Sequence, residues 1–149
     1  MDSLQGKYIK AGHTETPLTE LRLLARDDVD NIRRRVAENV RTPLDVLLEL
    51  AVDDNAEVRM AVADNVQTPV ETLWLLSGDE HADVRYSIAE NPRVPLAILQ
   101  LLCQDSNPYV SSRAARTLRI LSLPPGSDAN IHSGDKTQSK NYWSQRWYR

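Results

Sequence analysis

Apolar residues recur along the chain every 26 residues. Leucine holds two columns at this spacing, isoleucine or valine a third, and proline, aspartate and alanine hold others. The columns are Pro17, Pro43, Pro69 and Pro95; Leu21, Leu47, Leu73 and Leu99; Leu24, Leu50, Leu76 and Leu102; Asp27, Asp53, Asp79 and Asp105; Ile32, Val58, Val84 and Val110; Ala37, Ala63, Ala89 and Ala115. Columns that stay in register predict four tandem repeats over residues 16–123, counted as repeats 1 to 4 from their prolines.

Each repeat is predicted to form two short helices, and the first begins at a proline. A threonine hydroxyl before the proline suits an N-cap, with proline at the first helical position. Asp45 and Glu71 then fall at the third helical position and complete a capping box in repeats 2 and 3. Val94 replaces the cap in repeat 4. The threonines are Thr16, Thr42 and Thr68.

The second helix is predicted to begin near the acidic cluster of each repeat, because acidic side chains suit the positive pole of the helix dipole. Val58, Val62 and Val66 then share one face at a spacing of four. An asparagine follows the helix, where the left-handed conformation is often required. These asparagines are Asn39, Asn65 and Asn91.

Such a helix pair cannot bury its apolar side alone, so neighbouring pairs must stack. Repeat 4 departs from the pattern: Thr117 replaces the asparagine, and no proline follows until Pro124. Its second helix is therefore predicted to continue toward Pro124 and to cap the array. The sequence contains no phenylalanine and is rich in leucine and alanine, which also favours helices. The predicted fold is therefore all-α.

These repeats resemble a known class of helical repeats. Units such as DDNAEVRMAVADNVQTPVETLWLLS and AENPRVPLAILQLLCQDSNPYV resemble the leucine-rich repeat variant, and the spacing from Asp53 to Val58, Arg59 and Ala63 is similar to HEAT repeats. The resemblance covers about residues 16–120. It implies a right-handed superhelix (solenoid) of four 26-residue helix pairs that acts as a protein-binding scaffold. Some HEAT-like proteins instead remove alkylated bases from DNA or attach pigments to proteins.

Two departures from the family accompany this resemblance. The variant repeat is usually slightly shorter, and the cysteine cluster that binds an iron–sulfur centre in one such protein has no counterpart here. Cys103 is the single cysteine, and its column otherwise holds alanine or serine. An inert buried thiol is expected there, with a nucleophile as the alternative.

An aspartate stands six residues before an arginine in each of the first three repeats. In HEAT-type repeats, such residues bond within and between neighbouring units, and a guanidinium fork can satisfy carboxylate and carbonyl oxygens together. A structural ladder is therefore expected, with phosphate binding by the arginines as the alternative. Ser111 interrupts it in repeat 4. The pairs are Asp27 and Arg33, Asp53 and Arg59, and Asp79 and Arg85.

Positions that vary between repeats are candidates for partner binding. One column of the second helix, opposite Val58, would line a concave face and place an apolar spot in a charged setting. An ordinary solvated face is the alternative. Trp74 on the first helix is a further candidate, or a core residue. The candidates of the second-helix face are Arg34, Met60, Tyr86, Asp64 and Glu90.

The pattern of charges bears on the class of partner. Repeats 2 and 3 are acidic, all four lysines lie outside the repeats, and the net charge is −3. Nucleic acid is therefore an unexpected partner, because binding to it requires a continuous basic surface. The three histidines hold no repeated position and no nucleophile–base or metal spacing. No catalytic residue, cofactor or metal is expected.

The ends of the chain lie outside the repeats. Residues 1–15 are predicted to be an N-terminal arm without an apolar signal, and no segment is long enough to span a membrane, so a cytoplasmic protein is expected. Residues 124–141 read as a flexible linker. The aromatic segment, residues 142–149 (YWSQRWYR), contains Trp143 and Trp147. It could dock on its own array, on a neighbouring copy or on another protein, or remain disordered; a homo-oligomer could also form through the array ends.

The sequence thus favours a non-catalytic scaffold that binds a protein on its second-helix face. The alternative is a HEAT-like protein directed to DNA or acting in base excision, for which Trp74, Arg33, Arg34 and Arg35 are the local candidates.

Overall fold

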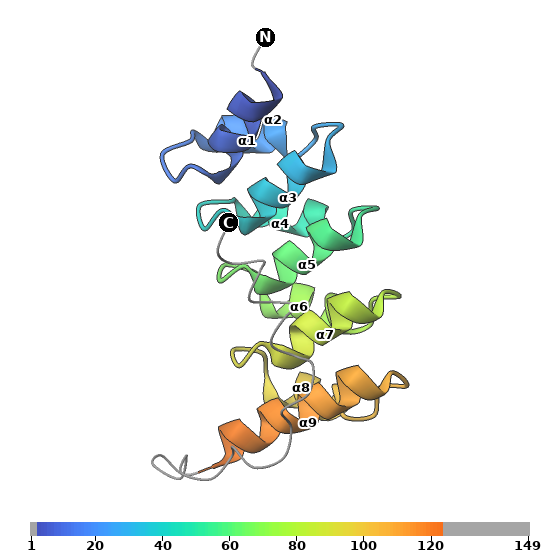
Figure 1. The fold of residues 1–149 in the computed structure, drawn as a ribbon. Coiled ribbons are helices and arrows are strands. Elements are labelled where there is room, and N and C mark those ends of the chain that lie inside the picture. Colours follow the sequence, from blue (N-terminus) through green and yellow to red (C-terminus); the bar gives the residue numbers. More distant parts are fainter. Residues whose placement is uncertain (1–2, 124–149) are drawn as a thin grey trace.

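The computed structural model describes residues 3–123, and these residues form nine α-helices and no strand (Figure 1). The predicted all-α class is confirmed. The helices are α1 (Leu4–Gly12), α2 (Leu18–Leu24), α3 (Asp30–Glu38), α4 (Leu44–Leu50), α5 (Ala56–Asp64), α6 (Val70–Ser77), α7 (Ala82–Glu90), α8 (Leu96–Leu102) and α9 (Pro108–Ser122).

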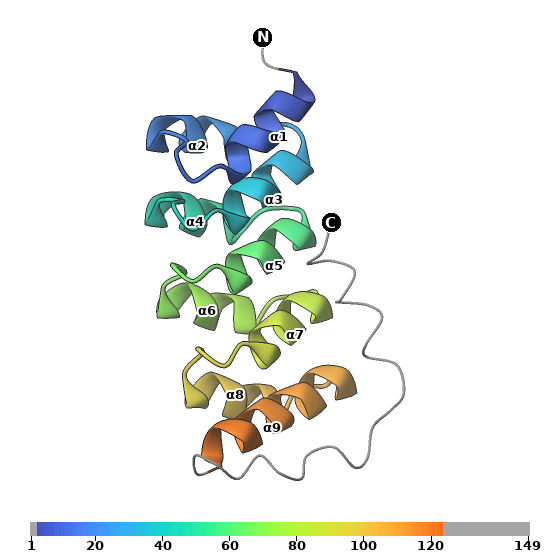
Figure 2. The ribbon, with the colours of Figure 1, turned by 60° about the vertical axis from the view of Figure 1, so that its left-hand side comes forward.

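The helices stack in chain order in two layers (Figure 2). The first layer holds α2, α4, α6 and α8, and the second layer holds α1, α3, α5, α7 and α9. Consecutive helices of the second layer pack closely against each other, whereas the helices of the first layer touch each other much less. This packing is consistent with stacked helical repeats. The hand of a superhelix stays a prediction.

The periodic columns form the core between the two layers. The eight leucines of the two leucine columns are at most 6% exposed, and the isoleucine and valine column is at most 1% exposed. A further buried column on the second helices adds to this core: Val36, Val62, Ile88 and Ala114. Because equivalent positions meet equivalent neighbours, one continuous core runs through all repeats.

The array begins earlier than the sequence pattern predicted. Residues 4–12, expected in an N-terminal arm, form α1, which packs against α3 as a second helix without a preceding first helix. Ala11 is fully buried 26 residues before Ala37, and Lys7 stands 26 residues before Arg33. The described chain therefore contains half a repeat before repeat 1.

The threonines before the prolines do not cap the helices that follow. The N-cap residues are the prolines themselves, with no side-chain cap, so the predicted capping boxes with Asp45 and Glu71 are wrong. Each threonine hydroxyl donates instead to a carbonyl six residues earlier, at the end of the preceding second helix. The bonds join Thr16 to Lys10, Thr42 to Val36 and Thr68 to Val62, at 2.5–2.6 Å. Each of these carbonyls also accepts the backbone N–H three residues later, so the hydroxyl is a second donor to the end of the helix.

The asparagines after the second helices are extended, not left-handed as predicted. Asn65 has φ −67° and ψ 129°, and its side chain forms the turn instead. Its Oδ1 accepts from the Gln67 N–H at 2.8 Å, while its Nδ2 donates to the carbonyls of Ala37 and Asn39 in the preceding repeat at 2.7 and 3.0 Å. Asn39 repeats these roles, and Asn91 repeats them with one carbonyl, that of Ala63 at 3.3 Å. The column is thus an inter-repeat ladder of amides.

Two further expectations concern the ends of second helices. Val66 lies beyond the end of α5 and is 58% exposed, so its predicted place on the buried face is wrong. The predicted extension in repeat 4 is confirmed, because α9 runs from Pro108 to Ser122. Ala115 is exposed where Ala89 is fully buried, since none of the described helices stacks beyond α9.

The buried hydroxyl of Thr72 provides a test of this packing. Thr72 is 2% exposed in a column with buried Val46 and Ile98, and its Oγ1 has no hydrogen-bond partner among the described residues. An unsatisfied buried hydroxyl costs free energy, so Thr72→Val should raise the free energy of unfolding by about 1 kcal/mol in urea titrations. The matched control, Thr42→Val, should lower it by about 1 kcal/mol because that hydroxyl is bonded. A destabilising Thr72→Val would contradict this account.

Candidate functional site

Each ladder arginine ties two neighbouring repeats together. Arg59 donates from Nε and Nη2 to the carboxylate of Asp79 in the next repeat, at 2.7 and 2.9 Å. Its Nη1 donates to the carbonyls of Asp53 and Asp54 in its own repeat, at 2.7 and 3.2 Å. Arg33 and Arg85 make the equivalent contacts. The guanidinium fork therefore fixes the loop of one repeat against that of the next.

The aspartates of this ion-pair ladder also organise their own loops. Each accepts the backbone N–H two residues later, as Asp79 does from His81 at 2.8 Å. Asp105 likewise accepts the Asn107 N–H. Its own repeat has Ser111 in place of the arginine, but Arg85 of the preceding repeat still donates to its carboxylate. At the other end, Lys7 binds Asp27 at 2.6 Å. The rungs are Lys7–Asp27, Arg33–Asp53, Arg59–Asp79 and Arg85–Asp105.

The ladder keeps its groups charged. Burial by itself raises the pKa of the Asp79 carboxyl, but the hydrogen bonds from Arg59 and the His81 N–H outweigh burial and hold that pKa below its usual value. For Asp105, the hydrogen bond from Arg85 is the main reason for a lowered pKa. The hydrogen bond to Asp79 raises the pKa of Arg59. With their donors already occupied, the ladder arginines do not favour the alternative of phosphate binding.

The second-helix face differs from the predicted partner surface at its centre. Met60 is 3% exposed, so the apolar contact predicted there is wrong. Tyr86 is half-buried against the core, and burial raises the pKa of its hydroxyl. The reason is the close stacking of the second layer: α3 and α7 flank α5 and cover positions on its sides that an isolated helix would expose.

The polar candidates on this face are bound to other side chains of the second helices. Arg34 forms ion pairs with Glu38 and Glu57 at 3.5 and 3.6 Å, the second of which crosses between repeats. The Asp64 carboxylate accepts the Ser87 hydroxyl at 2.8 Å, and Glu90 lies 3.9 Å from Arg113. These residues hold neighbouring second helices together.

The arginines needed for a DNA-directed function are similarly occupied. Arg33 belongs to the ion-pair ladder, and Arg35 binds Glu38 at 2.9 Å while its guanidinium lies 5.5 Å from the ring centroid of Tyr8. Trp74 lies on α6, in the other layer and in another repeat. The structure does not bring these candidates together.

Exposed apolar side chains gather on the first layer. Six side chains of repeats 2 and 3, on α4 and α6 and just after α4, are 43–67% exposed and form what we term the outer strip. It includes Trp74, which is therefore not a core residue. Leu96 and Leu101 extend the strip onto α8. The outer strip comprises Leu44, Leu48, Val52, Val70, Trp74 and Leu75.

In repeat 1, arginines stand 26 residues before two members of the outer strip, and these arginines form ion pairs with repeat 2. Arg22 binds Asp45 through two bonds of 3.0 and 3.1 Å, and Arg26 binds Glu49 at 2.8 and 3.1 Å. Both pairs join residues 23 apart. Between repeats 2 and 3, the residues equivalent to Arg26 and Glu49 are Val52 and Leu75. These two residues line one shallow hollow together. Apolar residues thus replace the charged bridge.

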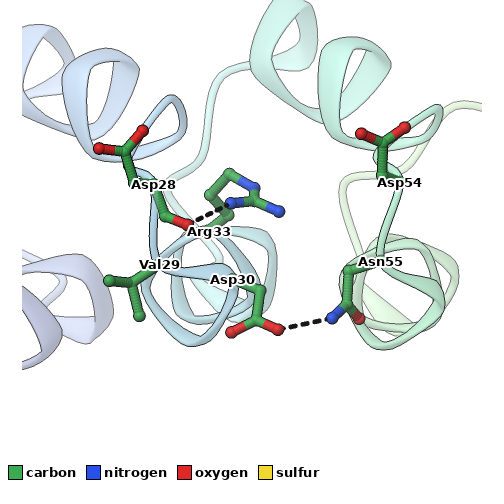
Figure 3. A pocket seen from close by; sticks show the side chains of 6 residues that line it. All are labelled: Asp28, Val29, Asp30, Arg33, Asp54 and Asn55. Carbon is green, nitrogen blue, oxygen red and sulfur yellow. Dashed lines mark hydrogen bonds between the residues drawn. The ribbon is translucent and has the colours of Figure 1, made fainter.

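A second shallow hollow lies between the loops that precede α3 and α5 (Figure 3). Asn55 donates to Asp30 at 2.7 Å across it, and Arg33 donates to the Asp28 carbonyl. The carboxylates of Asp28 and Asp54 extend apart rather than converging on one point. Within residues 3–123, no group of three or more side chains is arranged to hold a metal ion. The hollow is a seam between repeats.

The remaining candidates are placed as follows. Cys103, predicted to be buried, is half-buried against the core. His81 caps α7 by accepting the Asp83 N–H at 3.4 Å, a role that its column, shared with Asn55 and Asn107, could have indicated. Trp143 and Trp147 lie outside the described residues.

Comparisons with protein family models, curated proteins and solved structures found no match for this chain. In the part of the chain that the structure describes, none of the helices has the length and apolar character needed to cross a bilayer. The resemblance to leucine-rich repeat variant and HEAT proteins therefore rests on the residues themselves.

Removing one ladder arginine should strongly destabilise the array. Arg59→Leu leaves the Asp79 carboxylate buried without its partner, so we expect a loss of about 3 kcal/mol in the free energy of unfolding. The control Arg22→Leu removes an exposed pair and should cost far less. Urea titrations monitored by circular dichroism would measure both. Equal losses would show that the ladder contributes no more than a surface ion pair.

The lowered pKa values of the ladder aspartates predict acid sensitivity. A carboxyl whose pKa is lower in the folded state stabilises the fold above its unfolded pKa of about 3.9, and this contribution is lost as the pH falls through the folded value. The free energy of unfolding should therefore be level near neutrality and fall steadily below about pH 4. Urea titrations across this range would measure it, and Asp79→Asn should show a shallower fall. An identical slope for that variant would contradict the assignment.

Proposed function

We propose that this chain is a non-catalytic scaffold that binds protein segments on the outer strip. The observation that supports the proposal is the collection of six half-exposed apolar side chains on adjacent repeats. Val52 and Leu75 of this group meet in one hollow, and exposed apolar side chains that gather in one place mark interaction sites. The proposed binding surface therefore lies on the first layer rather than on the second-helix face, where Met60 is buried and Arg34 is ion-paired.

The charges around the outer strip indicate the chemistry of the partner. The first helices of repeats 2, 3 and 4, with the residues up to their ladder aspartates, contain no lysine or arginine. Exposed Glu71 lies beside Trp74 on α6, and exposed Asp54 and Glu80 line the hollow of Val52 and Leu75. Aromatic or aliphatic side chains accompanied by basic residues would complement this surface, whereas a phosphate backbone would be repelled.

A displayed library of random peptides selected on the full chain would test this proposal. Selected peptides should combine aromatic and basic residues, and Trp74→Glu should weaken their binding at least tenfold. The matched control is Tyr109→Glu, because Tyr109 is 77% exposed on α9 in the other layer and undergoes the same kind of change. Binding to that variant should equal binding to the wild type. Fluorescence anisotropy of labelled peptides would measure both affinities.

Two results would contradict the proposal. Peptides that bind Trp74→Glu as tightly as the wild type would place the site away from the outer strip. Tight retention of labelled DNA that weakens with added salt would favour the nucleic-acid alternative.

A further inference from the structure

Building on the proposed function, we propose that the outer strip is occupied by the aromatic segment, residues 142–149 of the same chain. This segment contains Tyr142, Trp143, Trp147 and Tyr148, which are half of the eight aromatic residues in the whole sequence. Such side chains are stabilised by leaving water, and the outer strip offers six half-exposed apolar side chains on two neighbouring repeats.

The charges of the segment complement those of the strip. Residues 136–149 carry two lysines and two arginines and no acidic residue. The hollow beside the strip has an apolar side formed by Val52 and Leu75 and an acidic rim of Asp54 and Glu80. An aromatic ring fits the apolar side, and an adjacent guanidinium such as that of Arg146 fits the rim.

The path of the chain also brings the segment within reach. The long helix α9 packs against α8, and its last turns lie beneath α8 on the side of the first layer (Figure 2). In the first layer, α6 and α4 lie one and two repeats from α8 (Figure 2). Residues 124–141 could span up to about 60 Å if extended, which exceeds this separation.

Connection to the array favours the same chain over a second copy. A tether of this length gives the segment an effective concentration on the order of millimolar at its own array. Another molecule at micromolar concentration supplies far less. An outside partner must therefore displace the segment, and the segment sets the affinity threshold for binding to the strip.

A labelled peptide tests this occupancy in the full chain. A fluorescein-labelled peptide of residues 138–149 is titrated into the wild type and into a chain carrying Trp143→Ser and Trp147→Ser, which should leave the strip open. We expect binding to the open chain and at least tenfold weaker binding to the wild type. Adding Trp74→Glu to the open chain should weaken binding at least tenfold, and adding Tyr109→Glu should not change it.

Three outcomes would overturn the inference, and thermal unfolding of every variant would confirm that each is folded. Equal binding to the wild type and the open chain would show that the segment does not cover the strip. If the peptide does not bind the open chain, the segment is excluded as the occupant of the strip. Peptides selected from the library would in that case still support the proposed function. A dimer in sedimentation velocity that is lost with Trp143→Ser and Trp147→Ser would place the segment on a second copy.

Discussion

The arginine fork that joins two loops is the constraint on which the stacking depends. Arg59 holds carbonyls of its own loop, starting six residues earlier, and a carboxylate twenty residues later. Together these offsets make up the 26-residue period. Because Arg59 and Asp79 are almost fully buried, neither group can return to water while the helices stay stacked. The amide ladder of Asn65 reinforces the same step from the other end of the second helix.

The sequence predicted those parts of the fold in which equivalent residues make the same contact in every repeat. The leucine, valine and aspartate columns recur because equivalent slots impose the same residue, and they predicted the helix pairs and the core. The threonines and asparagines recurred equally clearly, but local capping explained them as well as tertiary contacts did. Asn65 bonds to residues 26 and 28 positions earlier, a distance at which capping rules give no guidance. Lys7 and Ala11 carried the signal of the extra half repeat.

The candidate surface was harder to predict, because variation between repeats does not measure exposure. Met60 varies and is buried, since the second layer is closely packed, whereas Trp74 varies and is half-exposed because the first layer is more open. The informative signal was the change in chemistry along one column. Arg22 in repeat 1 is followed by Leu48 and Trp74, so this column changes from ion-paired to apolar between repeats 1 and 3.

The matching of contact offsets to the period has a genetic consequence. Duplication or loss of a whole 26-residue unit joins an arginine to an equivalent aspartate, so arrays of different length can arise by unequal recombination without a new interface. An insertion of one codon between Arg59 and Asp79 has no such tolerance at its own junction, because it changes the twenty-residue offset of that rung, although Arg85 and Asp105 keep theirs. The same rule makes the surface evolvable: each unit can be recruited, discarded or diversified on its solvent side while its junctions remain unchanged.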